Sequence, residues 1–377
     1  MADFYFQFEN DLLKHYVRTH GWLPPCRQRL RELRVGTRGQ PRRLRYFTFC
    51  AAGAIDVLML DVAKVIRPSN DGRFDTVVFF DRTAEAVAET QKNIPGSIGF
   101  PGDFTTVVLL DDPEEDTVVD TEEELKGERE DSNTAETHRR QMLITQRRRF
   151  IQLFPFDIVN LDLEEFLLKP NDPLPGKVVN ALRKLLSWQR RSIPGDKGRR
   201  IDSFVFMFTT QIGPPNLNEQ YLQMLEQYLV QNITTDPELR NLLRQRIGDE
   251  APAELRTRNF AEFFKLAMPK VLAASLRTED WFIDPEKGIR IYEFGRESRE
   301  GPYSMLHLVM EVRRQEPPAD RRAPGQEGRG VAEAYEAVVR QLFRQGATLV
   351  SEASIPRATL ERDLERIFSR RKKYLGG

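Results

Sequence analysis

The sequence predicts an α/β protein with a mainly parallel sheet, and three observations support this. Strongly apolar runs at 45–50, 76–80, 156–162 and 203–209 have the composition of buried strands. Each run is followed by residues with helical spacing. Several of the runs also end on small or acidic residues, as strands often do at a ligand-binding edge. Strand and helix taking turns at this spacing indicate a parallel sheet covered on both faces.

The first elements surround the strand at 45–50. Residues 4–20 have helical spacing, and Trp22-Leu23-Pro24-Pro25 is expected to end that helix. A basic helix or arm at 27–43 then leads into the strand. The small-residue turn at 50–54 follows, and apolar residues at helical spacing run from there to Ile66.

The next stretch predicts two more strands and an insertion. After the strand at 76–80, a helix is expected over 84–91, and a third short strand at 105–110. Residues 111–137 carry thirteen acids against Lys126 and Arg129, and they show no amphipathic period. We therefore expect 111–148 to be a surface or mobile insertion whose basic end is helical.

The second half continues the alternation and then becomes more helical. A helix at 176–191 separates the fourth and fifth strands, and apolar stripes at 221–229 and 260–272 predict two further helices. Two strands, 288–294 and 304–312, read as an antiparallel hairpin at a sheet edge.

These elements divide the chain into four parts. Residues 1–44 are expected to form a basic N-terminal helical arm and 45–314 the α/β domain with its acidic insertion. Residues 315–330 have linker composition, and 331–377 are expected to form a small helical appendage.

Composition limits the classes of function. The chain contains Cys26 and Cys50 as its only cysteines, together with four histidines, which excludes a disulfide framework and a cysteine zinc site. No apolar run approaches the roughly 20 residues that span a bilayer, and the N-terminus lacks the pattern of a signal peptide. We expect a cytoplasmic protein without membrane or metal partners.

Small and acidic residues follow three successive strands. Ala52 and Gly53 lie in the turn at 50–54, where a cofactor can approach the backbone closely. Asp81 closes the second strand and could accept hydrogen bonds from ribose hydroxyls, and Asp103 could face an adenine amine. The structural alternatives are a tight turn at Gly53, a helix N-cap at Asp81 and a turn residue at Asp103.

Asn160 and Asp162 lie at the end of the fourth strand. An amide and a carboxylate at such a strand end could orient an amine and remove its proton. Asp162 could equally cap the segment that follows.

The order of these motifs resembles that of class I S-adenosylmethionine-dependent methyltransferases, and most of all the tRNA N2,N2-dimethylguanosine methyltransferases. The resemblance covers roughly residues 40–314 and rests on these segments: Cys50-Ala51-Ala52-Gly53-Ala54-Ile55-Asp56, Phe80 to Asn93, Gly102-Asp103-Phe104, Phe156 to Asp162, Thr209-Thr210 and the hairpin within 289–314.

The resemblance implies a Rossmann-like methyltransferase fold with a closing antiparallel hairpin. It implies S-adenosylmethionine as cofactor, held by Ala52, Gly53, Asp81 and Asp103, with Asn160 and Asp162 as catalytic residues. A nucleic-acid base is the implied substrate. Leu163-Glu164-Glu165 stands where the family has a proline followed by an aromatic residue or glycine.

Arginine clusters add a second indication of nucleic-acid binding. Arg42, Arg43, Arg147 and Arg148 belong to basic runs that could contact phosphates of RNA or DNA. A solvated charged face is the alternative, and 111–149 or the C-terminal helices could instead bind a partner protein.

Three hypotheses follow. The first is a methyltransferase acting on a nucleic-acid base. The second is a catalytically inactive scaffold or binding subunit of a bacterial multiprotein assembly, such as a defence system, and it is motivated by Leu163-Glu164-Glu165 and the acidic insertion. The third is an α/β protein that binds a different adenosine ligand.

Overall fold

The computed structural model describes most of the chain. Its described ranges are 8–35, 43–50, 53–110, 134–163, 176–190, 201–212, 219–249, 251–298, 301–314, 340–341, 344 and 346–375.

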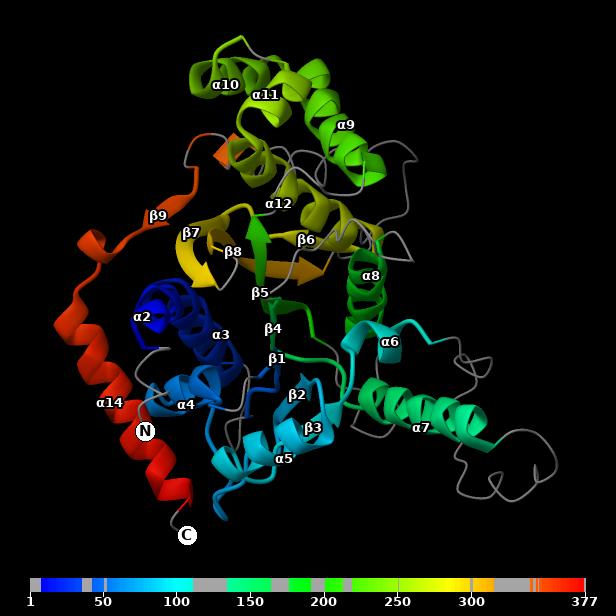
Figure 1. Ribbon diagram of the computed structural model, residues 1–377, viewed down its shortest axis with the longest axis vertical. Coiled ribbons are helices and arrows are strands. Elements are labelled where there is room, and N and C mark those ends of the chain that lie inside the picture. Colours follow the sequence, from blue (N-terminus) through cyan, green and yellow to red (C-terminus); the bar gives the residue numbers. More distant parts are fainter. Residues whose placement is uncertain are drawn as a thin grey trace.

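A single mixed sheet forms the centre of the described part (Figure 1). Its strands are β1 (Tyr46–Phe49), β2 (Val77–Asp81), β3 (Ile98–Pro101), β4 (Ile158–Asp162), β5 (Ser203–Ile212), β6 (Trp281–Ile283), β7 (Ile289–Ser298), β8 (Gly301–Arg314) and β9 (Thr348–Val350). They are arranged in the order β3-β2-β1-β4-β5-β8-β7-β9, and β6 pairs with β8.

Strand directions define the fold class. The five strands β1 to β5 pair in parallel, whereas β8 runs antiparallel to both β5 and β7. The order 3-2-1-4-5 is that of a doubly wound, Rossmann-like sheet. The predicted fold class, a mainly parallel α/β sheet with a closing antiparallel hairpin, is therefore confirmed.

Helices cover both faces of this sheet. They are α2 (Phe8–Val17), α3 (Leu23–Val35), α4 (Ile55–Val62), α5 (Ala84–Asn93), α6 (Phe104–Val108), α7 (Thr134–Ile151), α8 (Lys177–Gln189), α9 (Glu219–Thr235), α10 (Pro237–Ile247), α11 (Pro252–Arg258), α12 (Phe260–Thr278) and α14 (Arg357–Leu375), with a π-helical turn η1 (Arg18–Trp22) and a 3-10 turn η3 (Glu352–Ser354). Figure 1 shows α2, α3, α4 and α14 on one side and α6, α7, α8 and α12 on the other.

Side-chain alternation along the strands builds two cores. In β4, Val159 and Leu161 belong to the core beneath α6, α8 and α12, and Ile158 belongs to the core beneath α2, α3 and α4. Because alternate residues of a strand point to opposite faces, Asn160 and Asp162 lie on the α2, α3 and α4 side.

The strand predicted at 105–110 is wrong. Ile98–Pro101 forms β3, and Phe104–Val108 forms the short helix α6. The Asp103 carboxylate accepts a hydrogen bond from the Thr105 amide (2.9 Å) and thereby caps the helix. The β-branched composition of this run favours a strand locally, and the cap decides otherwise.

The helix end predicted at Pro24-Pro25 is also wrong. The helical backbone continues from α2 through η1 into α3, and the Leu23 N–H bonds to the Arg18 carbonyl five residues earlier. The two prolines follow this wide π turn and fall in the first turn of α3, where a missing N–H is tolerated.

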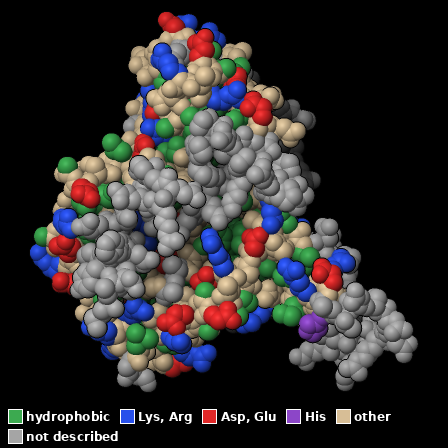
Figure 2. Space-filling model, in the orientation of Figure 1, with side chains coloured by type: hydrophobic (Ala, Val, Ile, Leu, Met, Phe, Trp, Pro, Cys, Tyr) green, Lys and Arg blue, Asp and Glu red, His purple; other side chains and the backbone are tan. Residues whose placement is uncertain are grey.

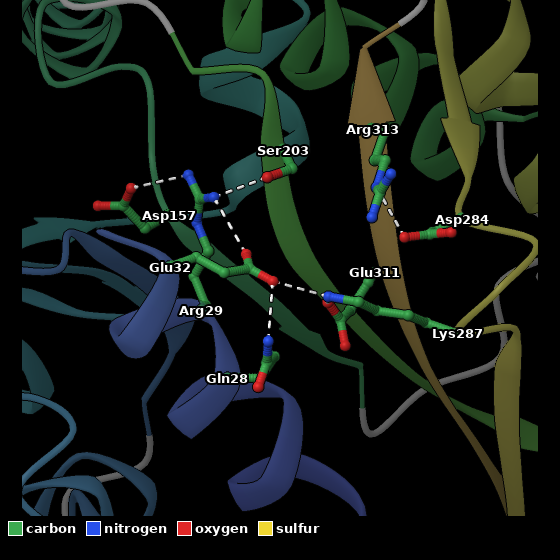
Figure 3. A network of polar contacts seen from close by, with 9 residues as sticks. All are labelled: Gln28, Arg29, Glu32, Asp157, Ser203, Asp284, Lys287, Glu311 and Arg313. Carbon is green, nitrogen blue, oxygen red and sulfur yellow. Dashed lines mark hydrogen bonds and ion pairs between the residues drawn. The ribbon is translucent and has the colours of Figure 1, made fainter. Parts of the chain in front are cut away.

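Polar contacts hold α3 along the sheet (Figure 3). Arg29 donates to Ser203 Oγ (2.6 Å) and pairs with Asp157 (3.5 Å), and Lys287 pairs with Glu32 (2.8 Å). Asp157 and Ser203 precede or begin β4 and β5, so these contacts lie at the amino-terminal edge of the parallel strands. The start of α3, with η1 before it, therefore lies towards the opposite, carboxyl-terminal edge.

Several sequence expectations lie outside the described residues. The acidic run at 111–133, the linker at 315–330 and most of the first part of the appendage, up to residue 345, belong to this group. The basic end of the predicted insertion is helical, as expected, and forms α7.

Candidate functional site

The carboxyl ends of β1, β2 and β3 lie at one edge of the sheet. The register pairs Phe49 with Phe80 and Asp81 with Pro101. The Gly102 N–H also donates to the Asp81 carbonyl (2.8 Å). The ends of these strands are therefore adjacent, and Gly53, Asp81 and Asp103 close them or follow them closely.

The turn after β1 leaves the first N–H groups of α4 without a side-chain cap. Ala54 has a left-handed conformation (φ +47°) and precedes α4 without a side-chain cap. A Cβ placed on Gly53 would contact Ile55 alone, at 3.4 Å, so the space beside this glycine is open among the described residues. The uncapped amides of α4 can therefore donate to an anionic or polar ligand. Ala52 lies outside the described residues.

Asp81 is half-buried and keeps hydrogen-bonding capacity. Its Oδ1 accepts a hydrogen bond from the Arg82 amide (2.7 Å). The cap of α5 is Thr83, whose hydroxyl accepts from the Ala86 amide (3.2 Å), so the N-cap alternative for Asp81 does not hold. Asp81 Oδ2 has no hydrogen-bond partner within the described ranges and can accept from a ligand hydroxyl.

The Asp103 carboxylate is already occupied by hydrogen bonds and an ion pair within the protein. In addition to capping α6, its carboxylate binds Lys177 (2.9 Å) and the hydroxyls of Thr105 and Thr106 (2.9 Å each). Burial raises the pKa of Asp103, but the hydrogen bonds from Lys177 and the threonines outweigh it and hold the pKa below its usual value. An adenine amine would have to compete with these partners.

Asn160 belongs to a buried network that fixes the turn after β1. Asp56, in the first turn of α4, accepts hydrogen bonds from Tyr46 Oη (2.7 Å) and Thr48 Oγ1 (2.8 Å). The Asn160 amide donates to Tyr46 Oη (3.0 Å). This network ties α4 to β1 and β4, so Asn160 supports the turn from inside the core. The alternation of Tyr46 and Thr48 along β1, followed by an acid early in the helix, was the sequence signal for it.

Asp162 lies beneath α2. Its carboxylate forms an ion pair with Lys14 Nζ (2.6 Å), and both side chains are at least nine-tenths buried. Burial raises the pKa of Asp162, but the charge and hydrogen bond of Lys14, followed by the charge of Arg18, keep the pKa below its usual value. Asp162 is thus ionised and already paired at neutral pH.

Beside Asp162, Thr209, which is part of the resemblance, contacts two residues that sequence reasoning did not connect to the site, His307 and Trp22. His307 of β8 receives a hydrogen bond from Trp22 Nε1 and contacts Thr209 Oγ1 through Nδ1 (2.6 Å). All three side chains are buried at the carboxyl edge of β5, which β8 pairs at Thr209 and His307. No sequence motif links them, because they come from three distant elements.

The predicted nucleic-acid residues are scattered. Arg43 pairs with Asp75, and Arg42 lies outside the described residues. Arg147 differs from the expectation: it is 1% exposed and lies over the Trp188 ring (5.4 Å), because α7 turns it towards the core. Arg148 is half-buried. Figure 2 shows basic and acidic side chains mixed over the described parts of this face.

The described residues lack a metal-binding cluster and a membrane-spanning helix. They contain no group of three or more His, Cys, Asp or Glu side chains placed to hold a metal ion. In the same ranges, no helix is long and apolar enough to cross a membrane.

Comparison with known proteins gave little. No family model matches the chain, and no curated protein matches it. Among solved structures the chain is similar to an O-methyltransferase from Bacillus cereus in complex with SAH, at 11% identity and a TM-score of 0.24, over 80% of this chain and 91% of that one. At that TM-score the likeness carries no argument, and the fold assignment rests on the strand order.

Proposed function

We propose that the protein is methyltransferase-like and binds S-adenosylmethionine at the carboxyl edge of β1 and β2. One observation carries this proposal: two ligand-binding features occur at the same edge of the sheet. Asp81 has a carboxylate oxygen without a hydrogen-bond partner among the described residues, and α4 begins beside Gly53 without a side-chain cap. The resemblance of the motifs in their order along the chain supports the same cofactor.

Each group has a specific part in this proposal. Asp81 accepts hydrogen bonds from the ribose hydroxyls, since an ionised carboxylate can accept two at once. Gly53 allows the ligand to approach the backbone, and the amides of α4 face its polar end. When bound, the cofactor would supply an activated methyl group.

Methyl transfer to a nucleic-acid base remains the proposed reaction. In the described structure the Lys14–Asp162 ion pair closes the carboxyl end of β4. Asp162 can therefore orient an acceptor amine only when Lys14 withdraws or is displaced by the substrate.

The same ion pair favours a second candidate, a scaffold that binds the cofactor without transferring its methyl group. A buried carboxylate that is paired at 2.6 Å with a buried ammonium is not available to bind a methyl acceptor. The partner of such a scaffold would be another protein of the assembly.

Calorimetry with S-adenosylhomocysteine tests the cofactor proposal. Asp81→Ala should weaken binding by about 10- to 100-fold, because hydrogen bonds to a charged group contribute about 1.5–3 kcal/mol. Asp71→Ala, an exposed acid in the turn before β2, is the matched control and should bind like the wild type. Equal binding by both variants would remove the basis for the site.

Transfer of a labelled methyl group separates the two candidates. Incorporation into RNA or DNA supports the enzyme, whereas saturable cofactor binding with no incorporation supports the scaffold. Melting-temperature shifts with ATP or NAD that exceed those with S-adenosylhomocysteine would point instead to another adenosine ligand.

A further inference from the structure

Arg18 carries a buried positive charge without a counter-charge. Its side chain belongs to η1 and is 7% exposed. Nε and Nη1 are buried and have no hydrogen-bond partner, and the guanidinium lies over the Trp22 ring at 5.7 Å. A buried ionised group without a partner is costly, so such a group points to a ligand of opposite charge.

The place of Arg18 in the fold matters. Its charge acts on Asp162, at the end of β4, where it lowers the carboxyl pKa after the larger effects of burial and Lys14. It acts also on Cys50, at the end of β1, where it opposes the rise in the thiol pKa caused by burial and Asp56. Arg18 is therefore near the ends of the adjacent strands β1 and β4.

This position is the topological switch point of the sheet. From β1 the chain proceeds to β2 and β3 on one side, and later to β4 and β5 on the other. Doubly wound sheets bind their ligands in the crevice at such a point. The π turn that carries Arg18 is a backbone form found frequently at functional sites.

The charged groups near Arg18 do not include an ion-pair partner for it. Lys14 is paired with Asp162. His15 and His307 are neutral at pH 7, since burial lowers the pKa of each to about 3. Asp56 and Asp81 act on the same Cys50 thiol as Arg18, but no carboxylate of the described residues lies within ion-pair distance of the guanidinium, so Nε and Nη1 remain available to an anionic ligand.

We propose that Arg18 binds the carboxylate of the amino-acid end of the ligand whose ribose is held by Asp81. This inference rests on the proposed function and assigns a specificity residue to it. A ligand that spans the ends of β2, β1 and β4 places its sugar at Asp81 and its far end at the switch point, next to Arg18. The protein would then distinguish adenosyl ligands that carry an α-carboxylate from those that lack one.

Two ligands separate this inference from the proposed function. S-Adenosylhomocysteine has the carboxylate, and 5′-methylthioadenosine has the same adenosyl group without it. Calorimetry of the full chain with both should show tighter binding of S-adenosylhomocysteine. Arg18→Met should lower that affinity by about 10- to 100-fold and leave the affinity for 5′-methylthioadenosine unchanged. Arg27→Met, at an exposed arginine of α3, should alter neither.

The melting temperature without ligand gives a second readout. Arg18→Met removes an unpaired buried charge and keeps the volume of the side chain, so the variant should melt at or above the wild-type temperature. A merely structural arginine would give the opposite result. Arg18→Lys, which keeps the charge, should retain part of the preference for S-adenosylhomocysteine.

The outcomes are distinct. If the wild type binds neither ligand, the proposed function fails and this inference fails with it. If the wild type binds both but Arg18→Met weakens both equally or neither, the proposed function stands and the role of Arg18 is refuted. A loss confined to S-adenosylhomocysteine supports both.

Discussion

Two hydrogen bonds at the carboxyl edge of the sheet fix the protonation state of His307. An indole N–H can only donate, so His307 Nε2 must accept the hydrogen bond from Trp22. Nδ1–H then donates to Thr209 Oγ1 (2.6 Å), which fixes the ring as a neutral tautomer. Burial lowers the pKa of His307 to about 3, consistent with a ring that has no room for a second proton.

This histidine makes stability sensitive to acid. In the unfolded chain histidine titrates near pH 6.5, whereas folded His307 stays neutral down to about pH 3. Between those values the unfolded state binds more protons, so stability falls as the pH falls. From pH 6.5 to 5 the loss should be about 2 kcal/mol from His307 alone.

Urea denaturation at pH 7 and pH 5 measures this loss. His307→Gln keeps a donor and an acceptor but cannot titrate, so its loss between the two pH values should be smaller than that of the wild type by about 2 kcal/mol. Identical losses in the two proteins would show that His307 is protonated in the native state.

Sequence alone predicted which residues end the strands better than it predicted the partners of those residues. Gly53 and Asp81 follow strands that could be recognised locally, and their position at one edge follows from a parallel sheet. The partners of Asp162 and Asp103 are Lys14 and Lys177, which are remote in the chain. The packing of α2 brings Lys14 to Asp162, and the packing of α8 brings Lys177 to Asp103. No local sequence pattern encodes either contact.

At the scale of elements, α14 acts as a clamp on α4. Arg370 pairs with Asp61 of α4 (2.6 Å), and Tyr374 Oη donates to the same carboxylate (2.8 Å). Asp61 is buried, so it depends on these partners. Figure 1 shows α14 running along the α4 side of the molecule. Because α4 carries the amides beside Gly53, this contact also supports the turn at Gly53.

Removing one side of the clamp should destabilise the protein. Arg370→Met leaves the buried Asp61 with less compensation, and we expect a loss of about 1–3 kcal/mol in the free energy of unfolding. Arg366→Met, on the same helix, removes an exposed pair with Asp363 and should change it by less than about 0.5 kcal/mol. Equal stability of the two variants would show that α14 does not hold α4.

Element prediction succeeded for strongly apolar strands and for helices with a long period, and it failed for short segments that have neither feature. The strands β1, β2 and β4 follow from their apolar runs, and the helices α8 and α12 follow from long runs with a clear helical period. The helix α6 and the strand β6 have five and three residues, too few to show a period. Caps and pairing partners decide such short segments.

At the scale of the whole molecule, strand order brings the site together. The chain leaves β1 in one direction and returns to β4 on its other side, so the turn after β1 and the end of β4 lie at the same edge of the sheet, where doubly wound sheets bind ligands. The continuous helical backbone from α2 to α3 crosses the same edge and delivers Lys14 and Arg18 there. The sequence predicted the helix that carries both residues, but no local pattern indicated that this helix packs against the carboxyl edge of the sheet.

A crystal structure of the full chain grown with saturating S-adenosylhomocysteine tests the proposed binding site. We expect the ribose hydroxyls on the Asp81 carboxylate, the ligand against the backbone at Gly53, and its carboxylate on Arg18. Ligand bound elsewhere, or crystals without ligand between the ends of β1 and β4, would rule out this site.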